Sequence, residues 1–360
     1  MKKVFIISPL VVCVCLLFLA CTKEGGVIYK PDPEDQADTS PVVTVVYDPD
    51  ALGDIGYNDL IYKGVEDAAR RHGLRTLQLS PNTVDEGVAS LETAIQTMAD
   101  AQDTVRRLLI VAGVSYDTFL RKNNDRLAAN SRADLLYFET HIPLEGKGST
   151  LDIPYYGAMY EAGAIAPADA AEVLLVGANP KARSVAAAVQ GFADGFQSSP
   201  IQPADASHKK LVTTWLSDDV SGGFSVADST ALRVMHTPEW QSYPHLLVPV
   251  CGGAGVTFRR LSETLAIYHF VGVDCPVVSA KSNFSVVKHI DRAVSRCIGQ
   301  WLSPDGMPKH QSLGLADGFT GIELHPYTED SKERFAASLG EELLQQIHRT
   351  AIEKEADYEK

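Results

Sequence analysis

The chain lacks the short motifs that mark common catalytic centres. It has no Gly-x-Ser-x-Gly nucleophile elbow, no His-Glu-x-x-His helix and no phosphate-binding P-loop. It also has no Cys-x-x-Cys pair and no cysteine–histidine spacing of the kind that holds zinc. Its histidines are scattered, and packing explains His269 and His289 most simply. These absences favour binding over catalysis, and we predict neither a metal nor a cofactor.

Positive charge is scarce as well. The 360 residues include 32 lysines and arginines against 46 aspartates and glutamates, which gives a net charge of −14. Nucleic acids and anionic lipid surfaces select proteins with stripes of lysine and arginine. The acidic composition therefore argues against nucleic acid as a partner, although it leaves room for a local basic pocket.

The first 20 residues have the pattern of a secretory signal peptide. Two lysines near the start precede an almost wholly apolar stretch from Val4 to Ala20, which Pro9 interrupts. The run 18–21, Phe-Leu-Ala-Cys, resembles the bacterial lipobox, which implies that Cys21 is acylated. We therefore expect an exported protein, anchored by lipid to a bacterial membrane and facing the periplasm or the exterior. Ordinary cleaved secretion is the alternative.

Residues 21–40 read as a flexible tether, because they contain Gly25-Gly26 and a segment rich in proline and acidic residues. About 320 residues of ordinary globular composition follow, which is large for one core and favours two lobes. Cys251 and Cys275 each follow an apolar run, so a disulfide between them is possible. Three free buried thiols, with Cys297 as the third, are the favoured alternative.

Short β-branched runs alternate with amphipathic stretches along most of the chain. This alternation predicts parallel sheets with crossover helices, in two successive units. The expected strands are 42–47, 74–79, 108–112, 135–138, 173–176, 211–215, 246–250 and 269–273. The expected helices are 58–72, 88–98, 116–129, 156–165, 182–196, 224–235 and 256–265.

Further elements follow the second unit. Apolar residues from Val286 to Trp301 predict a helix, an irregular strand-like stretch runs to Ile322, and Phe335 to Ile347 predict a last helix. We expect the chain to cross back between lobes and form a clamshell with several hinge strands. The expected N-terminal lobe is 41–138 plus about 277–312, and the expected C-terminal lobe is 139–276 plus about 313–360.

The loop 48–58 is the first candidate binding segment, because ligands lie beyond the carboxyl ends of parallel strands. Asp48 can accept hydrogen bonds from hydroxyls, Tyr57 can stack on a flat ring, and Asn58 offers a donor and an acceptor. A calcium loop from Asp48, Asp50 and Asp54 is one alternative, although the spacing does not match the twelve-position loop. A solvated turn with Asn58 as helix cap is another.

Later loops supply four more candidates. Gly252 and Gly253 allow a ligand to approach the backbone closely before a helix. Asp274 ends the last parallel strand and can hold sugar hydroxyls, or it can simply cap its loop. Lys288, expected on the following helix, can orient Asp274 or meet a ligand oxygen, or it can be a solvated lysine.

Two aromatic candidates flank the loop after strand 211–215. Either Trp215 or Phe224 can face Tyr57 across a planar base in a binding cleft. Both can equally be ordinary core residues.

An ordered series of segments resembles the basic membrane protein (BMP) family of substrate-binding lipoproteins, which includes bacterial purine nucleoside receptors. Residues 48–58 are similar to the family's Asp-x-Gly-Gly-x-x-Asp-x-Ser-Phe-Asn segment, with Asp50-Ala51 in place of Gly-Gly and Gly56-Tyr57 in place of Ser-Phe. Pro276 stands where the family has a second aspartate. The other similar segments are 160–163, 191–195, 252–255, 272–274 and 285–288.

The resemblance implies an α/β protein of the type I periplasmic-binding-protein fold, in which two parallel-sheet lobes joined by hinge strands enclose the ligand. It also implies that Asp48, Tyr57, Asn58, Asp274 and Lys288 contact that ligand. The leading hypothesis is a lipid-anchored solute-binding protein that captures a nucleoside-like molecule and delivers it to an ABC-type permease. The departures leave room for another ligand.

Two other functions remain open from the sequence. One is a surface or periplasmic sensor lipoprotein of the same fold, which binds a sugar or other small solute without transport. The other is a secreted hydrolase that uses Asp48 and Asp274 as an acid–base pair.

Overall fold

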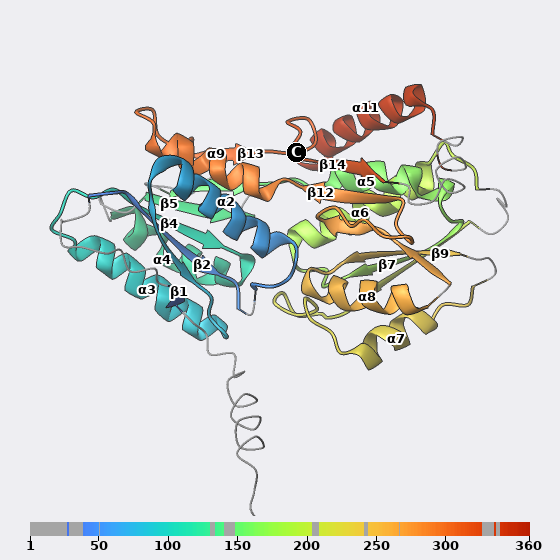
Figure 1. Cartoon of the computed structure of the whole chain (residues 1–360), viewed down its shortest axis with the longest axis horizontal. Helices are drawn as coiled ribbons and strands as arrows, with labels where there is room; N and C mark the ends of the chain where they lie inside the picture. Colours follow the sequence, from blue (N-terminus) through green and yellow to red (C-terminus); the bar gives the residue numbers. More distant parts are fainter. Residues whose placement is uncertain are drawn as a thin grey trace, which may run out of the picture.

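Two α/β lobes lie side by side in the computed structural model (Figure 1). The structure describes residues 27–28, 39–49, 51–129, 134–139, 148–203, 209–240, 244–265, 267–325, 335 and 339–360. The expected signal peptide, Cys21 and Asp50 lie outside these ranges. Within them, no helix combines the length and apolar character needed to cross a membrane.

The first lobe is built on a seven-stranded sheet with the order β1-β3-β2-β4-β5-β6-β13, in which every pairing except β1 with β3 is parallel. Strand β2 has five consecutive buried residues, as expected for a central parallel strand covered on both faces. The strands are β1 (Val27–Ile28), β2 (Val42–Tyr47), β3 (Arg75–Leu79), β4 (Arg107–Ala112), β5 (Asp134–Phe138), β6 (Gly148–Asp152) and β13 (His310–Ser312).

Four helices belong to this lobe: α2 (Tyr57–His72), α3 (Val84–Asp100), α4 (Asp117–Ala129) and α9 (Ile290–Leu302). Helices α2 and α9 are far apart in the sequence but pack together (Figure 1). Gly64 permits this approach, since a Cβ atom there would lie 2.6 Å from the carbonyl oxygen of Asp291.

The second lobe contains a four-stranded parallel sheet with the order β10-β9-β7-β8. Its strands are β7 (Glu172–Gly177), β8 (Lys210–Trp215), β9 (His245–Val250) and β10 (Tyr268–Phe270). Its helices are α5 (Tyr156–Ile165), α6 (Arg183–Ser198), α7 (Asp228–His236) and α8 (Gly253–Thr264).

Glycines let α5 and α6 touch through their backbones. A Cβ atom on Gly163 would lie 2.1 Å from the Phe192 carbonyl oxygen, and one on Gly195 would lie 2.0 Å from the Tyr160 carbonyl oxygen. All ten residues of α5 are buried. The segments 160–163 and 191–195, which carry part of the family resemblance, therefore serve helix packing.

A small third sheet packs on the second lobe. It has the order β11-β12-β14, with β11 (Gly272–Asp274) parallel to β12 (Phe284–Lys288) and β12 antiparallel to β14 (Thr320–Leu324). Strands β12 and β14 contact α5, and the last helix, α11 (Glu341–Tyr358), packs on α5 as well (Figure 1).

Within the described ranges, the chain passes between the lobes three times. The crossings follow β6, β12 and β13, at residues 153–155, 289 and 313–319. Parallel sheets with crossover helices in two units are thus confirmed.

The lobe boundaries differ from those expected. Strand β6 was expected in the C-terminal lobe but pairs with β5 in the first sheet. Residues 277–288 were expected in the N-terminal lobe, yet β12 belongs to the third sheet, against the second lobe. Local patterns place strands in the chain, but strand pairing is a tertiary property.

Three local expectations were wrong. Val286 to Lys288 lie on strand β12 rather than on the predicted helix, because a short apolar run fits a buried strand as well as a helix. The predicted strand 269–273 is divided between β10 and β11, which belong to different sheets. Val27–Ile28, within the expected tether, pair with β3.

Candidate functional site

A cavity of about 480 Å³ lies between the lobes, beyond the carboxyl ends of the parallel strands. This is the edge at which ligands lie in open α/β sheets, and the volume suits a small molecule. Of the predicted binding residues, all but Trp215 line it: Asp48, Tyr57, Asn58, Phe224, Gly252, Gly253, Asp274 and Lys288. The structure therefore brings residues from both lobes and from the hinge around one space.

Asp54 organises the loop before α2. Its Oδ1 accepts a hydrogen bond from the Gly56 N–H at 2.9 Å, and its Oδ2 accepts from the Asn58 N–H at 3.0 Å. Asp54 thus satisfies the free amides at the start of α2, the role that the alternative reading gave to Asn58. In the calcium alternative Asp54 was to be a ligand, but its carboxylate is engaged by these amides.

Asn58 is held in one orientation by the same carboxylate. Its Nδ2 donates to Asp54 Oδ2 at 2.9 Å, so its Oδ1 is directed elsewhere. Among the described residues, neither Asn58 Oδ1 nor the Tyr57 hydroxyl has a hydrogen-bond partner, although both atoms are buried. An unsatisfied buried polar atom is costly, and a ligand in the cavity can supply the missing bond.

Asp48 directly follows β2 and is enclosed by the loop that follows β4. Its Oδ1 accepts from the Ser115 N–H at 3.3 Å. Gly113, with a φ of +148°, makes this possible, because a Cβ atom there would lie 2.1 Å from the Asp48 Cγ. Burial raises the pKa of Asp48 to about 6, even though the hydrogen bonds from Ser115 and Val114 act to lower it.

Lys288 forms a buried ion pair between the lobes. Its Nζ lies 2.9 Å from Oε1 of Glu139, which follows β5 in the first lobe, and the two side chains are 3% and 6% exposed. Burial acts to lower the pKa of Lys288, but Glu139 and Asp274 together raise it above its ordinary value. Lys288 is therefore a charged residue of the cavity wall and not a solvated helix lysine.

Asp274 has an unusual backbone conformation, with a φ of +71°. Its N–H donates to the hydroxyl of Tyr155 at 3.0 Å. Burial raises the pKa of the Asp274 carboxyl to about 6, while Lys288 acts to lower it. The charged groups of the cavity are therefore mostly carboxylates around one ammonium group.

The glycine loop after β9 supports Phe224. Gly252 has a φ of +51°, and a Cβ atom on it would lie 3.3 Å from the Phe224 ring. The Ala254 N–H donates to the Phe224 carbonyl oxygen at 2.7 Å. The loop thereby fixes the half-buried Phe224 at the second-lobe wall.

Trp215, one of the predicted binding residues, does not line this cavity. It pairs with Gly177, where a Cβ atom would lie 2.2 Å from the Trp215 ring, and it packs against the core of the second lobe. Phe224 packs against the same core and also lines the cavity.

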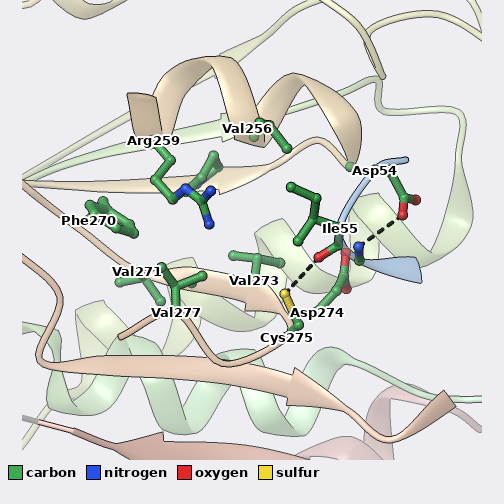
Figure 2. A pocket seen from close by; sticks show the side chains of 15 residues that line it. Asp54, Ile55, Val256, Arg259, Phe270, Val271, Val273, Asp274, Cys275 and Val277 are labelled. Atoms are coloured by element: carbon green, nitrogen blue, oxygen red, sulfur yellow. Dashed lines mark hydrogen bonds between the residues drawn. The ribbon is translucent and has the colours of Figure 1, made fainter. Parts of the chain in front are cut away.

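The cysteines of the described chain, Cys251, Cys275 and Cys297, are free thiols. The alternative disulfide between Cys251 and Cys275 is therefore absent. Instead the Cys275 Sγ donates to the Ile55 carbonyl oxygen at 2.9 Å, from the second lobe to the first (Figure 2).

A second, smaller pocket of about 50 Å³ adjoins this contact. Figure 2 shows Ile55, on the loop before α2, pointing toward Val256 and Val273 of the second lobe. Ile55 has a φ of +52°, which is rare for a β-branched residue, and its N–H donates to Asp59 Oδ2 at 2.8 Å. The loop before α2 thus touches the second lobe beside the main cavity.

Glu139 and Tyr155 line the cavity but were not among the predicted residues. Glu139 directly follows the predicted strand 135–138, so the rule that selected Asp48 and Asp274 would also have found it. Tyr155 lies in a crossing segment, and no local pattern distinguishes it.

No protein-family model matches the chain, and no curated protein has a significantly similar sequence. Several solved structures are similar in fold. An ABC transporter solute-binding protein from Aeropyrum pernix K1 has a TM-score of 0.60 and 17% identity, over 87% of this chain and 86% of that one. A transcriptional activator of the comK gene from Bacillus halodurans has a TM-score of 0.61 and 13% identity, over 86% and 98%.

GanP, a glucose–galactose binding protein from Geobacillus stearothermophilus, is also similar, with a TM-score of 0.54 and 15% identity, over 79% of this chain and 97% of that one. At such low identity these likenesses concern the fold. Together with the two lobes, the parallel sheets and the cavity between them, they lead to one conclusion: the chain has the type I periplasmic-binding-protein fold.

Proposed function

We propose that this protein is a lipid-anchored solute-binding protein that encloses a nucleoside-like molecule between its lobes and passes it to an ABC-type permease. The observation that carries the proposal is the interlobe cavity, whose described lining includes the carboxylates of Asp48, Asp54, Glu139 and Asp274 and the ammonium group of Lys288, which pairs with Glu139. Ionised carboxylates accept hydrogen bonds from hydroxyls. A ribose offers several hydroxyls, whereas a phosphate would meet repulsion from the carboxylates.

Aromatic and amide groups suit the base of such a ligand. Tyr57 from the first lobe and Phe224 from the second both line the cavity. Stacking on an aromatic side chain contributes about 1–3 kcal/mol per base. Asn58 presents a free acceptor, Oδ1, because Asp54 holds its amide nitrogen, so a donor on the base would satisfy it.

Binding of the ligand would favour closure of the two lobes. The ligand would touch groups from both lobes, so it would favour the closed form over the open form. GanP, which is similar in fold, is a glucose–galactose binding protein, and this similarity supports a polyhydroxylated solute as the ligand class here.

Calorimetry of the purified mature chain tests the ligand. We expect saturable binding of adenosine, guanosine or inosine at one site, and loss of that binding in Asp274→Asn. Trp215→Phe is the matched control, because Trp215 packs in the core. Binding of ribose, glucose or galactose without binding of any nucleoside would overturn the ligand assignment.

The anchor needs a separate test, because Cys21 lies outside the described residues. We expect Cys21→Ala to move the protein from the membrane fraction to the soluble fraction of cells and to abolish incorporation of labelled palmitate. Unchanged membrane association would contradict the lipid anchor.

A sensor of the same fold is the second candidate, favoured by the similarity to the comK transcriptional activator. Deletion of the gene distinguishes the two: loss of nucleoside uptake supports transport, and normal uptake with an altered transcriptional response supports sensing. A hydrolase would convert the bound molecule, so recovery of the ligand unaltered would support binding alone.

A further inference from the structure

We infer that Tyr155 is a positioning residue that links a hinge segment to two charged residues of the cavity wall, because its hydroxyl holds Asp274 and its ring holds Lys288. The inference rests on the function proposed above for the cavity. Tyr155 lies in the crossing segment between β6 and α5 and is only 3% exposed.

The Tyr155 hydroxyl joins two neighbouring strands. It accepts a hydrogen bond from the Asp274 N–H on β11 at 3.0 Å and donates one to the Val286 carbonyl oxygen on β12 at 3.0 Å. A hydroxyl has one donor and two acceptor positions, so it can make both bonds at once. The hydroxyl therefore bridges the backbones of β11 and β12, near the carboxyl ends of these two parallel strands.

This bond supports an unfavourable conformation. Asp274, with a φ of +71°, occupies a region that residues other than glycine rarely adopt. Such a residue persists where its surroundings hold it. The Tyr155 hydroxyl binds the N–H of this very residue, and so it keeps the Asp274 carboxyl at the cavity.

The Tyr155 ring supports the ammonium group. Lys288 Nζ lies 4.7 Å from the centroid of the Tyr155 ring, while Glu139 binds it from the first lobe at 2.9 Å. An aromatic face attracts a cation, most strongly where water is excluded. Tyr155 thus contacts the two oppositely charged residues that end β11 and β12.

The pKa of the Asp274 carboxyl distinguishes a positioning role of the Tyr155 hydroxyl from a role in packing alone. The nearby Tyr155 hydroxyl acts to lower the pKa of Asp274, against the effect of burial. Removing the hydroxyl should therefore raise this pKa further. The other titratable groups near Asp274 are Lys288, Glu139, Asp54, Tyr57, Cys251 and Cys275.

The experiment compares Tyr155→Phe with Tyr160→Phe in the mature chain. Tyr160 is a matched control, because its hydroxyl bonds Ser198 at 2.8 Å between two helices of the second lobe, away from the residues that line the cavity. Carboxyl-carbon NMR titration of the ligand-free proteins measures the Asp274 pKa, and calorimetry measures adenosine affinity.

We expect the Asp274 pKa to be higher in Tyr155→Phe than in the wild type and unchanged in Tyr160→Phe. Adenosine affinity should fall about tenfold or more in Tyr155→Phe, as expected when a buried backbone N–H loses its hydrogen-bond partner. The control should bind as the wild type does.

A second variant covers the case in which Tyr155→Phe does not fold. Incorporation of 3-fluorotyrosine at position 155 keeps the ring but makes the hydroxyl oxygen a weaker acceptor for the Asp274 N–H, so the Asp274 pKa should rise by less than in Tyr155→Phe. An unchanged Asp274 pKa in either variant would overturn the inference. If the wild type binds no nucleoside, the proposed ligand fails, but the titration of the ligand-free protein still decides the role of Tyr155.

Discussion

An ion pair joins the lobes at the cavity, and another joins them beside the hinge. The cavity pair is Lys288 with Glu139, and both of its side chains are almost completely shielded from water. The hinge pair is Arg183 with Asp152 at 3.2 Å, in which the arginine side chain is 36% exposed and also contacts Glu359. The two pairs connect the same lobes in very different surroundings.

The comparison shows that the charged groups that are most costly to bury lie around the cavity. Around the cavity pair, burial raises the pKa of Asp48, Glu139 and Asp274 above their ordinary values. Buried charges are expensive unless each has a partner. In the hinge pair Asp152 is 4% exposed, but water reaches Arg183, so the pair is partly screened. A ligand that completes the hydrogen bonds of the cavity would offset part of that cost.

The largest effect is expected when the cavity pair is broken. Lys288→Met leaves Glu139 buried without its partner, which should lower the free energy of unfolding by about 3–5 kcal/mol near neutral pH. Chemical denaturation measures this change. The double variant Lys288→Met with Glu139→Gln should recover most of the loss, because no charge is then stranded. A double variant as unstable as the single one would show that packing of the lysine, not its charge, matters.

Asp48→Asn should stabilise the ligand-free protein at pH 7.5 by up to about 3 kcal/mol. The folded-state pKa of Asp48, about 6, exceeds its ordinary value of 3.8. The folded state therefore binds the proton more tightly, and the stability associated with this group is full below pH 4 and falls as the pH rises to 6.

The gain from Asp48→Asn should therefore vanish at pH 4, and thermal unfolding at both values checks this. In the wild type, affinity for a hydroxyl-bearing ligand should rise as the pH increases through 6, because ionised carboxylates accept its hydrogen bonds. Equal gains at both pH values would mean that burial of the charge is not the cause.

A smaller loss is expected from Gly113→Ala. The new Cβ would collide with the Asp48 carboxyl, and a φ of +148° is strained for alanine, so unfolding free energy should fall by about 1–3 kcal/mol. Affinity for the ligand should fall as well, because Asp48 is displaced. Gly318→Ala is the matched control, since it is also a glycine with positive φ but has no atom within 4 Å of the added Cβ.

The smallest effect is expected at the hinge pair. Arg183→Met should lower the unfolding free energy by about 1 kcal/mol, and less at high salt, because Asp152 is buried but water reaches the arginine side of the pair. Ligand affinity should stay within about twofold by calorimetry. A loss as large as that of Lys288→Met would remove the distinction between the two pairs.

Much of the architecture could be read from local patterns. Central parallel strands such as Val42–Tyr47 are covered on both faces and appear as continuous apolar runs, and the helices between them show one apolar face. A polar residue directly after such a run marks the ligand edge, and this rule correctly placed Asp48 and Asp274 at the cavity. Applied once more, it would have placed Glu139 there.

Other features could not be read in this way. The segment Phe284–Lys288 is apolar and short, so its periodicity does not distinguish a strand from the first turns of a helix. Trp215 and Phe224 are both aromatic, are close in sequence and pack against the same core, yet only Phe224 lines the cavity. Which aromatic residue faces the ligand depends on the path of the loop between them.

Local patterns of apolar residues were sufficient to predict the strands and helices, because the burial of each element follows from its own pattern. The alternation of these elements was sufficient to predict a parallel α/β protein. The sequence also determined which strand ends carry polar groups. Only the tertiary structure decided that β6 and β13 join the first sheet, that Lys288 meets Glu139, and that Tyr155 holds Asp274. The contacts of β13 with β6, of Lys288 with Glu139 and of Tyr155 with Asp274 join residues more than a hundred positions apart, and such pairings are set by the packing of whole elements rather than by local propensity.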